Sequence, residues 1–339
     1  MTRRSLAFIV GARTLRDDYR SVARLTARSA RALGLGTVLV APDDDCYPNA
    51  VRDGWHTRLA AGSDPSVVVE AGRGEFAGVL GDGRDVAVLS AEVAAALSLP
   101  GPSPTAVAAC LNPGTRDRVL AEHAVPTDAG NGTGPRYVAQ VFDNRVVGVV
   151  RAVGGRSPDQ VQGHDSPPAD GRRVARSLRR LAGSAVAALR LGAAQVHLCW
   201  SPSGPLVLDV VPGEVDGVTA RLVQMSTGFD VVTAAVAGAV GFTVRPAGSV
   251  RLHACVRFLD AVPCDVPGAR DTVRAVPGVV EASFRPPGSV PAGWVVALAE
   301  RHDVAATAAE RAATVAERAA TVPVADPVAT MADPRGGAR

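Results

Sequence analysis

Short apolar runs alternate with longer amphipathic stretches over the first hundred residues. Residues 6–12 (LAFIVGA), 37–42 (TVLVAP) and 76–82 (FAGVLGD) have the length and apolar content of buried strands. Residues 18–33, between the first two runs, and 86–97, after the third, have the apolar spacing of helices. Because parallel neighbours need a crossover connection, this order predicts an α/β fold that begins with an open, Rossmann-like sheet.

The length of 339 residues suits two or three domains. Residues 154–171 are rich in Gly, Ser, Pro and Asp, which indicates a loop. We expect four regions along the chain: an N-terminal Rossmann-like domain (1–105), a connector with an α+β domain (106–245), a small C-terminal α/β domain (246–322) and a disordered tail (323–339).

The composition argues against several classes of protein. The arginines are spread along the chain, and no Arg-rich run alternates with aromatic residues, so nucleic acid is not an expected partner. Five cysteines without a C-x-x-C pair suggest reduced thiols and a cytoplasmic protein. The most apolar window, 231–244, is shorter than the roughly 18 apolar residues of a membrane span, and we expect a buried helix there.

The chain contains no lysine, and its 36 basic residues other than histidine are all arginine. Codon usage in a GC-rich genome can explain this bias without any functional cause. Chemically, however, the absence excludes every mechanism that needs an ammonium group as a compact phosphate ligand, because the planar guanidinium has a different shape and reach.

A strong hairpin signal lies in the second half of the chain. Residues 194–200 (AQVHLCW) and 205–211 (PLVLDVV) flank the turn SPSG. Side chains alternate between the two faces of a strand, which places His197 and Cys199 on one face of the first run. On the second run, alternate residues are expected to share a face: Val207, Asp209 and Val211.

Three segments resemble the ATP-grasp carboxylate–amine ligases. Residues 99–127 (LPGPSPTAVAACLNPGTRDRVLAEHAVPT) are similar to the entry into the ATP-grasp module, and 204–241 to a stretch that lines the active site. Gly163-His164 followed by Pro167-Pro168 resembles a Gly-His-x-x-Pro-Ala element of the amino-acid ligases. The resemblance implies a shortened ATP-grasp-like α+β domain between the Rossmann-like and C-terminal domains.

The departures from the family concern its nucleotide and metal sites. Only residues 128–135 stand where a nucleotide-covering subdomain would be, and even one hairpin needs more chain. Alignment on Gly204-Pro205 puts the family's two magnesium-binding Glu residues on His197 and Asp209, and its Asn on Val211. Since magnesium needs hard oxygen ligands, we expect neither a metal nor a nucleotide cofactor.

We therefore expect a repurposed protein, a pseudo-ligase of specialised amino-acid or peptide metabolism such as antibiotic biosynthesis. One reading is an ATP-independent lyase, cyclase, isomerase or hydrolase that acts on a small amino-acid-like carboxylate. Another is a non-catalytic partner or ligand-binding protein, and a third is an active ligase. The sequence leaves open whether the chain forms a homodimer, and no membrane partner is expected.

The expected catalytic pair is His197 and Asp209, because the family's two metal carboxylates lie across adjacent strands. Asp209 could orient the imidazole of His197 for acid–base work; the alternative is a hydrogen-bonded interior histidine. The candidate substrate contacts have alternatives as solvated turn residues or salt-bridge partners: Arg221, Glu214, Asp216 and His164.

Overall fold

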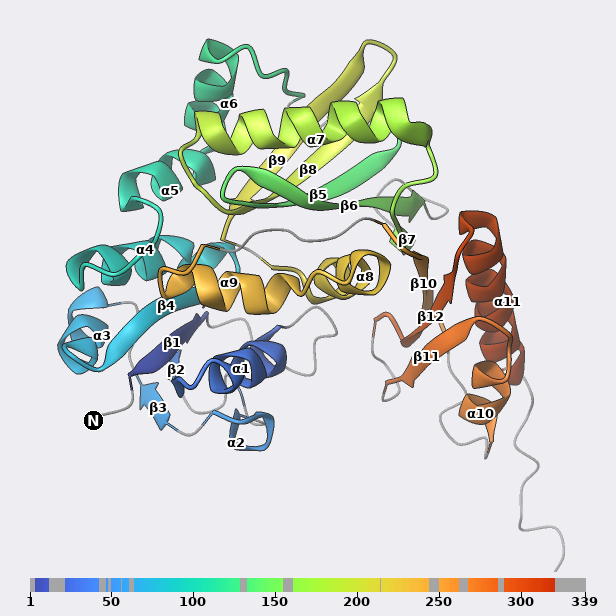
Figure 1. Cartoon of the computed structure of the whole chain (residues 1–339), viewed down its shortest axis with the longest axis horizontal. Coiled ribbons are helices and arrows are strands. Elements are labelled where there is room, and N and C mark those ends of the chain that lie inside the picture. Colours follow the sequence, from blue (N-terminus) through green and yellow to red (C-terminus); the bar gives the residue numbers. More distant parts are fainter. Residues whose placement is uncertain are drawn as a thin grey trace, which may run out of the picture.

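The computed structural model shows two sheets with helices packed on and between them (Figure 1). It describes residues 4–11, 22–42, 47, 50–55, 57–60, 64–128, 133–154, 161–213, 215–243, 250–261, 268–285 and 290–320. The predicted tail, 323–339, lies outside these residues.

The N-terminal sheet is parallel, with strand order β3-β2-β1-β4. Its strands are β1 (Ser5–Val10), β2 (Gly36–Ala41), β3 (Thr57–Ala60) and β4 (Phe76–Asp82). The helices of this region are α1 (Ala23–Ala32), α2 (Ala50–Asp53), α3 (Pro65–Gly72) and α4 (Ala87–Ala96), and the 3-10 turn η2 (Arg84–Val86) follows β4. The predicted open α/β sheet is confirmed, and the short edge strand β3 is an addition that the sequence pattern did not indicate.

A connector of two helices, α5 (Pro104–Leu111) and α6 (Pro113–Glu122), leads to an eight-stranded antiparallel sheet of order β11-β12-β10-β7-β6-β5-β8-β9. Its first five strands along the chain are β5 (Arg136–Phe142), β6 (Arg145–Gly154), β7 (Val161–Ser166), β8 (Ala194–Ser201) and β9 (Gly204–Pro212). Its last three are β10 (His253–Leu259), β11 (Val279–Phe284) and β12 (Gly293–Ala299). Since β10 pairs with β7, the C-terminal strands extend the central sheet. The domain boundaries themselves stay predictions.

The prediction of a loop over 154–171 is wrong for β7. The segment lacks the apolar alternation of a typical strand, yet its backbone pairs with β6 on one side and β10 on the other. Ladder hydrogen bonds with both neighbours satisfy a backbone that would otherwise lose its water on burial. Tertiary pairing therefore overrides the local composition.

The two faces of the central sheet are covered by different helices (Figure 1). The long helix α7 (Gly171–Ala188) buries residues such as Leu178 and Val186 against β5, β6, β8 and β9. On the other face, α8 (Gly217–Thr227) packs against β6, β7 and β10. The predicted buried helix at 231–244 is α9 (Val231–Ala239), which contacts β4 and α1 and so joins the two sheets through one core.

At the C-terminal end of the described chain, α11 (His302–Ala320) covers β10 and β12, beside the short helix α10 (Ala269–Arg274). Alanines of α11 pack on Cys255 and on Ala297 of the sheet. In the part of the chain that the structure describes, no single helix is long and apolar enough to span a membrane. The pair α8 and α9 reaches that length and apolar content together, but the two helices meet at a bend of 111°.

Candidate functional site

The β8–β9 hairpin places His197 directly opposite Asp209, as predicted. A β-bulge interrupts the pairing next to them, because Leu198 pairs with Val207 while His197 pairs with Asp209. The extra residue, Leu208, shifts the alternation by one, so Val207 and Val210 both pack into the core beneath α7. The prediction that Val207 and Asp209 share a face is therefore wrong.

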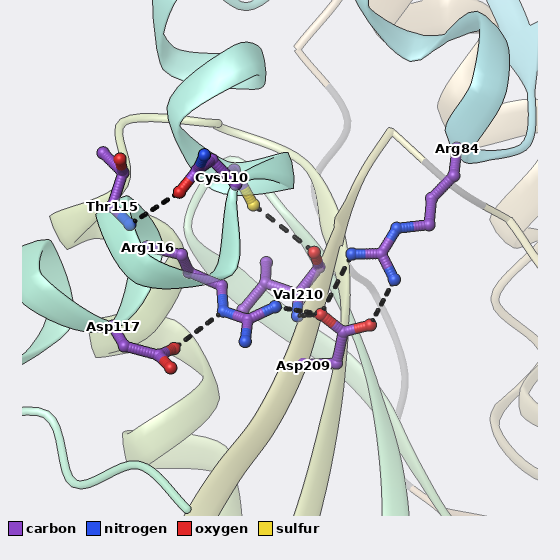
Figure 2. A network of polar contacts seen from close by, with 8 residues as sticks. Arg84, Cys110, Thr115, Arg116, Asp117, Asp209 and Val210 are labelled. Atoms are coloured by element: carbon purple, nitrogen blue, oxygen red, sulfur yellow. Dashed lines mark hydrogen bonds and ion pairs between the residues drawn. The ribbon is translucent and has the colours of Figure 1, made fainter. Parts of the chain in front are cut away.

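Two arginines enclose the carboxylate of Asp209 (Figure 2). Arg84 donates from Nη1 to Oδ2 at 2.7 Å and from Nη2 to Oδ1 at 3.3 Å. Arg116 donates from Nη1 to Oδ1. The backbone N–H of Val210 also donates to Oδ1, at 2.9 Å. Both carboxylate oxygens of Asp209 are thus engaged by cationic donors.

Local sequence explains how the two arginines reach this point. Arg84 opens η2 directly after the carboxyl end of β4, the end of a parallel strand at which ligand sites of open α/β sheets gather. Arg116 lies one turn into α6, whose start is fixed by Asn112 and Pro113. The Asn112 side chain caps the helix by accepting from the N–H of Thr115 at 3.0 Å.

The two guanidinium groups differ in their exposure. The side chain of Arg116 is 7% exposed and that of Arg84 is 46% exposed, while Asp209 lies between them at 26%. Arg116 is further held by Asp117, which accepts from its Nε at 3.0 Å. Arg116 is therefore a fixed part of the site, whereas Arg84 can change partner from the solvent side.

Cys199 shares a face with His197, but it is fully buried. Burial, and the nearby charge of Asp128, raise the pKa of the Cys199 thiol. A thiol that stays protonated at neutral pH is a poor nucleophile, so the structure does not support a nucleophilic Cys–His pair here.

The other predicted site residues lie elsewhere. Arg221, on α8, forms an ion pair with Glu281, which accepts from its Nε at 2.7 Å. Asp216 caps the start of α8 by accepting from the N–H of Thr219 at 2.7 Å. His164, on β7, stacks edge-on against Phe258 with ring centroids 5.7 Å apart.

Sheet order shows how far His164 lies from the hairpin. Strand β7 lies three strand spacings, or about 14 Å, from β8 and four spacings, or about 19 Å, from β9. Glu214 lies outside the described residues. The structure thus brings His197 and Asp209 together and leaves His164 apart, and the roles proposed for all of these residues stay predictions.

A cavity opens beside Gly83, the residue that precedes Arg84. It has a volume of about 70 Å³ and lies between the end of β4, helices α4 and α5, and the end of β9. Its lining is mostly apolar and small: Val79, Gly81, Gly83, Ala87, Ala91 and Pro212.

The resemblance described above implies a magnesium ion and a nucleotide, and the residues present do not fit them. Asp209 is the one carboxylate at the family's metal positions, and its oxygens accept from Arg84 and Arg116. Magnesium would have to displace two cations to bind there. In addition, α6 ends at Glu122 and β5 begins at Arg136, and the described residues between them form no helix or strand of a nucleotide-covering subdomain.

Comparison with known proteins gives a match in structure but not in sequence. No protein-family model matches the chain, and no curated protein matches it. The crystal structure of L-amino acid ligase from Bacillus licheniformis is similar, with a TM-score of 0.72 and 13% identity, covering 92% of this chain and 98% of that one.

Two further structures are similar over most of their length. Phosphoribosylglycinamide synthetase from Anaerococcus prevotii has a TM-score of 0.69 and 13% identity, with 89% of this chain and 95% of that chain covered. Carboxyaminoimidazole ribonucleotide synthase from Aspergillus clavatus, complexed with ATP, has a TM-score of 0.72 and 11% identity, with 94% and 100% covered. At such identities the likeness concerns the path of the chain and leaves its chemistry to the site residues.

Proposed function

We propose that this chain, which has the ATP-grasp-like fold of the carboxylate–amine ligases, binds a small amino-acid-like carboxylate without magnesium–ATP. The observation that supports this most directly is the position of Asp209 between Arg84 and Arg116. With Asp117, the partner of Arg116, two guanidinium groups and two carboxylates sum to zero at the point where the ligases bind a cation. Magnesium would have to displace both arginines from Asp209, whereas an anion needs only the half-exposed Arg84.

Arg84 is the group that would receive the ligand. An ion pair of a half-exposed arginine contributes little to stability, so Arg84 can leave Asp209 at small cost. Its guanidinium can then bind a ligand carboxylate through two parallel hydrogen bonds. Arg116, held by Asp117 and Asp209, would stay in place during this exchange.

The neighbouring cavity suggests the remainder of the ligand. Its walls are formed by glycine, alanine, valine and proline, so a small apolar side chain would fit better than a charged one. Small aliphatic amino acids and short peptides derived from them have this combination of a carboxylate and an apolar group. This agrees with a role in specialised amino-acid or peptide metabolism, which includes antibiotic biosynthesis.

A second candidate function is catalysis on that ligand, and the register of His197 opposite Asp209 favours it. If a ligand carboxylate draws Arg84 away, Asp209 gains a free oxygen with which to orient the imidazole of His197. An acid–base pair would then exist only in the ligand complex, which suits an ATP-independent lyase, cyclase, isomerase or hydrolase. Without turnover, the same site makes a non-catalytic ligand-binding protein.

Thermal denaturation with a panel of amino acids and dipeptides tests the binding proposal, because a ligand of the folded state raises its melting temperature. We expect a small apolar member to stabilise the wild type. The shift should vanish in Arg84→Gln and persist in Arg118→Gln, an exposed arginine of α6 paired only with Glu122 among the contacts described. Equal shifts in both variants, or no stabilising member in the panel, would refute the proposal.

Catalysis is tested separately with the stabilising ligand. Incubation of that ligand with the wild type and with His197→Asn, followed by mass spectrometry, would reveal any product. Turnover in the wild type with unchanged binding but no product in His197→Asn would support the enzyme. Product formation by both proteins would exclude His197 as the acid–base group.

A further inference from the structure

Three side chains of kinds that commonly bind metals, a carboxylate, a thiol and an imidazole, converge far from the β8–β9 hairpin. Asp165 on β7 and Cys255 on β10 face each other directly across the antiparallel pair. His302, the first residue of α11, closes the group, with its Nε2 at 3.0 Å from Oδ2 of Asp165. One ligand atom from each of the three residues lies within 4.8 Å of the other two.

A second layer of contacts fixes the carboxylate. Arg257 donates from Nη1 to Oδ1 of Asp165 at 2.7 Å, which leaves Oδ2 turned toward His302. Arg257 also contacts Glu310 on α11, with 3.3 Å between Nη2 and Oε1. Metal-binding carboxylates are commonly oriented in this way, with one oxygen on the metal and the other held by a hydrogen-bond donor.

The charges in this cluster can accommodate an added cation. The buried pair of Arg257 and Asp165 is neutral, and Glu310, whose side chain is 63% exposed, adds a negative charge on the solvent side. A divalent metal that converts the thiol of Cys255 to a thiolate adds one net positive charge, so the sum with Glu310 included is zero.

We propose that Asp165, Cys255 and His302 form a binding site for a zinc-class divalent metal ion. Oxygen, sulfur and imidazole nitrogen from three residues form a donor set that suits tetrahedral zinc, with water in the fourth position. Zinc bonds of about 2.0 Å separate neighbouring N and O ligands by roughly 3.3 Å, so the present 3.0 Å spacing of His302 and Asp165 needs little adjustment.

Binding must move two protons. The S–H bond of Cys255 breaks as the sulfur–metal bond forms, and that proton goes to solvent. The imidazole of His302 must present the lone pair of Nε2, so the neutral ring carries its remaining proton on Nδ1. The metal then replaces the hydrogen bond that now joins His302 to Asp165.

A nucleophile explains the cluster less well, because the fully buried sulfur of Cys255 offers no approach for a substrate. The ring of His253 lies beside that of His302, with centroids 5.8 Å apart. His302, whose side chain is 24% exposed, is the side from which an ion could enter.

The site would connect α11 to the sheet. Its ligands come from β7, β10 and the first turn of α11, so a bound ion would fasten the C-terminal helix to the central strands. We therefore expect metal to raise the thermal stability of the chain, since it binds the folded state and not the dispersed ligands of the unfolded one.

Metal titration of the full, metal-stripped chain tests the proposal. Zinc binding is measured by calorimetry, and cobalt(II) is used as an optical probe because a thiolate ligand gives it a charge-transfer absorption. The test variants are Cys255→Ser and His302→Gln. The matched controls are Cys110→Ser, at another fully buried cysteine, and His123→Gln, at an exposed histidine that directly follows α6.

We expect one equivalent of zinc, a rise in melting temperature and a cobalt–thiolate band in the wild type and both controls. Zinc affinity should fall by about tenfold or more in each test variant, and the band should vanish in Cys255→Ser. If Cys255→Ser fails to fold, the proposal is still tested by the zinc affinity of His302→Gln, a change at a partly exposed residue, and by the cobalt–thiolate band of the wild type. No zinc binding, no thiolate band, or equal affinity in His302→Gln and His123→Gln would overturn the proposal.

Discussion

Arg116 donates to the carboxylate of Asp209 from a helix 93 residues earlier in the chain, and its side chain is almost completely buried there. Arg84 donates to the same carboxylate from the end of the N-terminal sheet, but from a half-exposed position. The pair of contacts fastens the connector to β9 and leaves a solvent-facing contact between β9 and the N-terminal sheet.

This difference in burial predicts unequal losses of stability. Arg116→Ala removes a buried charge-assisted hydrogen bond and should lower the free energy of unfolding by roughly 2–3 kcal/mol. Arg84→Ala removes an exposed ion pair and should cost less than about 1 kcal/mol. Urea denaturation measures both, and equal losses would contradict the assigned roles.

The β-bulge in β9 predicts the order of stability losses for three truncations to alanine in this strand. Val207 and Val210 are both buried beneath α7, so each change to alanine should cost about 1–3 kcal/mol. Leu208 is partly exposed, and Leu208→Ala should cost less although it removes a larger group. Denaturation of the three variants checks this order, and a strand without the bulge would reverse it for Val207 and Leu208.

Gly78 permits the close approach of α9 to β4. A Cβ at this position would lie 2.5 Å from the carbonyl oxygen of Ala239, which is a backbone atom that cannot rotate away. Gly78→Ala should therefore destabilise the fold by about 1–3 kcal/mol. Gly238, in α9, has open space at its Cβ, so Gly238→Ala should be neutral or stabilising by up to about 1 kcal/mol. Similar melting temperatures for the two variants would contradict this packing.

Asp165 gives the fold a defined pH dependence. Burial alone would raise the pKa of Asp165, but the Arg257 guanidinium and hydrogen bonds from Arg257, His302 and Cys255 hold it below its usual value. Because the folded pKa lies below the unfolded one, ionised Asp165 stabilises the fold above about pH 4. That stabilisation is lost as the pH falls through the folded pKa.

Urea denaturation of Asp165→Asn at a series of pH values checks this. The stability gap between wild type and variant should be constant near neutrality and should narrow in acid. An exposed control, Asp271→Asn in α10, should stay within about 0.5 kcal/mol of wild type throughout. If the stability gap widened in acid, the pKa of Asp165 would be raised on folding and not lowered, which would contradict this prediction.

Much of the fold follows from local patterns in the sequence. The strands β1, β2 and β4 and the helix α9 come from continuous apolar runs, and the β8–β9 hairpin comes from two such runs around SPSG. These signals are strong because each is contained within a few residues. The ATP-grasp-like fold follows from the motifs at 99–127 and 204–241, and the structural comparisons confirm it.

The features that sequence reasoning missed depend on distant partners. Strand β7 exists because β6 and β10 supply its hydrogen bonds, and β3 is a four-residue edge strand with little pattern of its own. The bulge at Leu208 has no composition signal. Arg84 and Arg116 are ordinary surface-type residues in the sequence, and only the folded chain places them around Asp209.

A weak signal for both arginines does exist. Arg84 follows the carboxyl end of a predicted parallel strand, where ligand sites gather. Arg116 falls within the connector segment that resembles the family's entry into its ATP-grasp module. The sequence does not show that both side chains reach the carboxylate of Asp209, and this shared contact is what makes the two arginines part of one site.

Under our proposal, Asp209 binds Arg84 and Arg116 at the position where the ligases hold a metal ion. Calorimetric titration of the full chain with magnesium–ATP is the decisive experiment, with Asp209→Asn and the helix-capping Asp216→Asn as the pair of variants. We predict no saturable binding of magnesium–ATP to the wild type. Stoichiometric, magnesium-dependent binding that Asp209→Asn abolishes and Asp216→Asn retains would show that Asp209 is a metal ligand and refute the proposal.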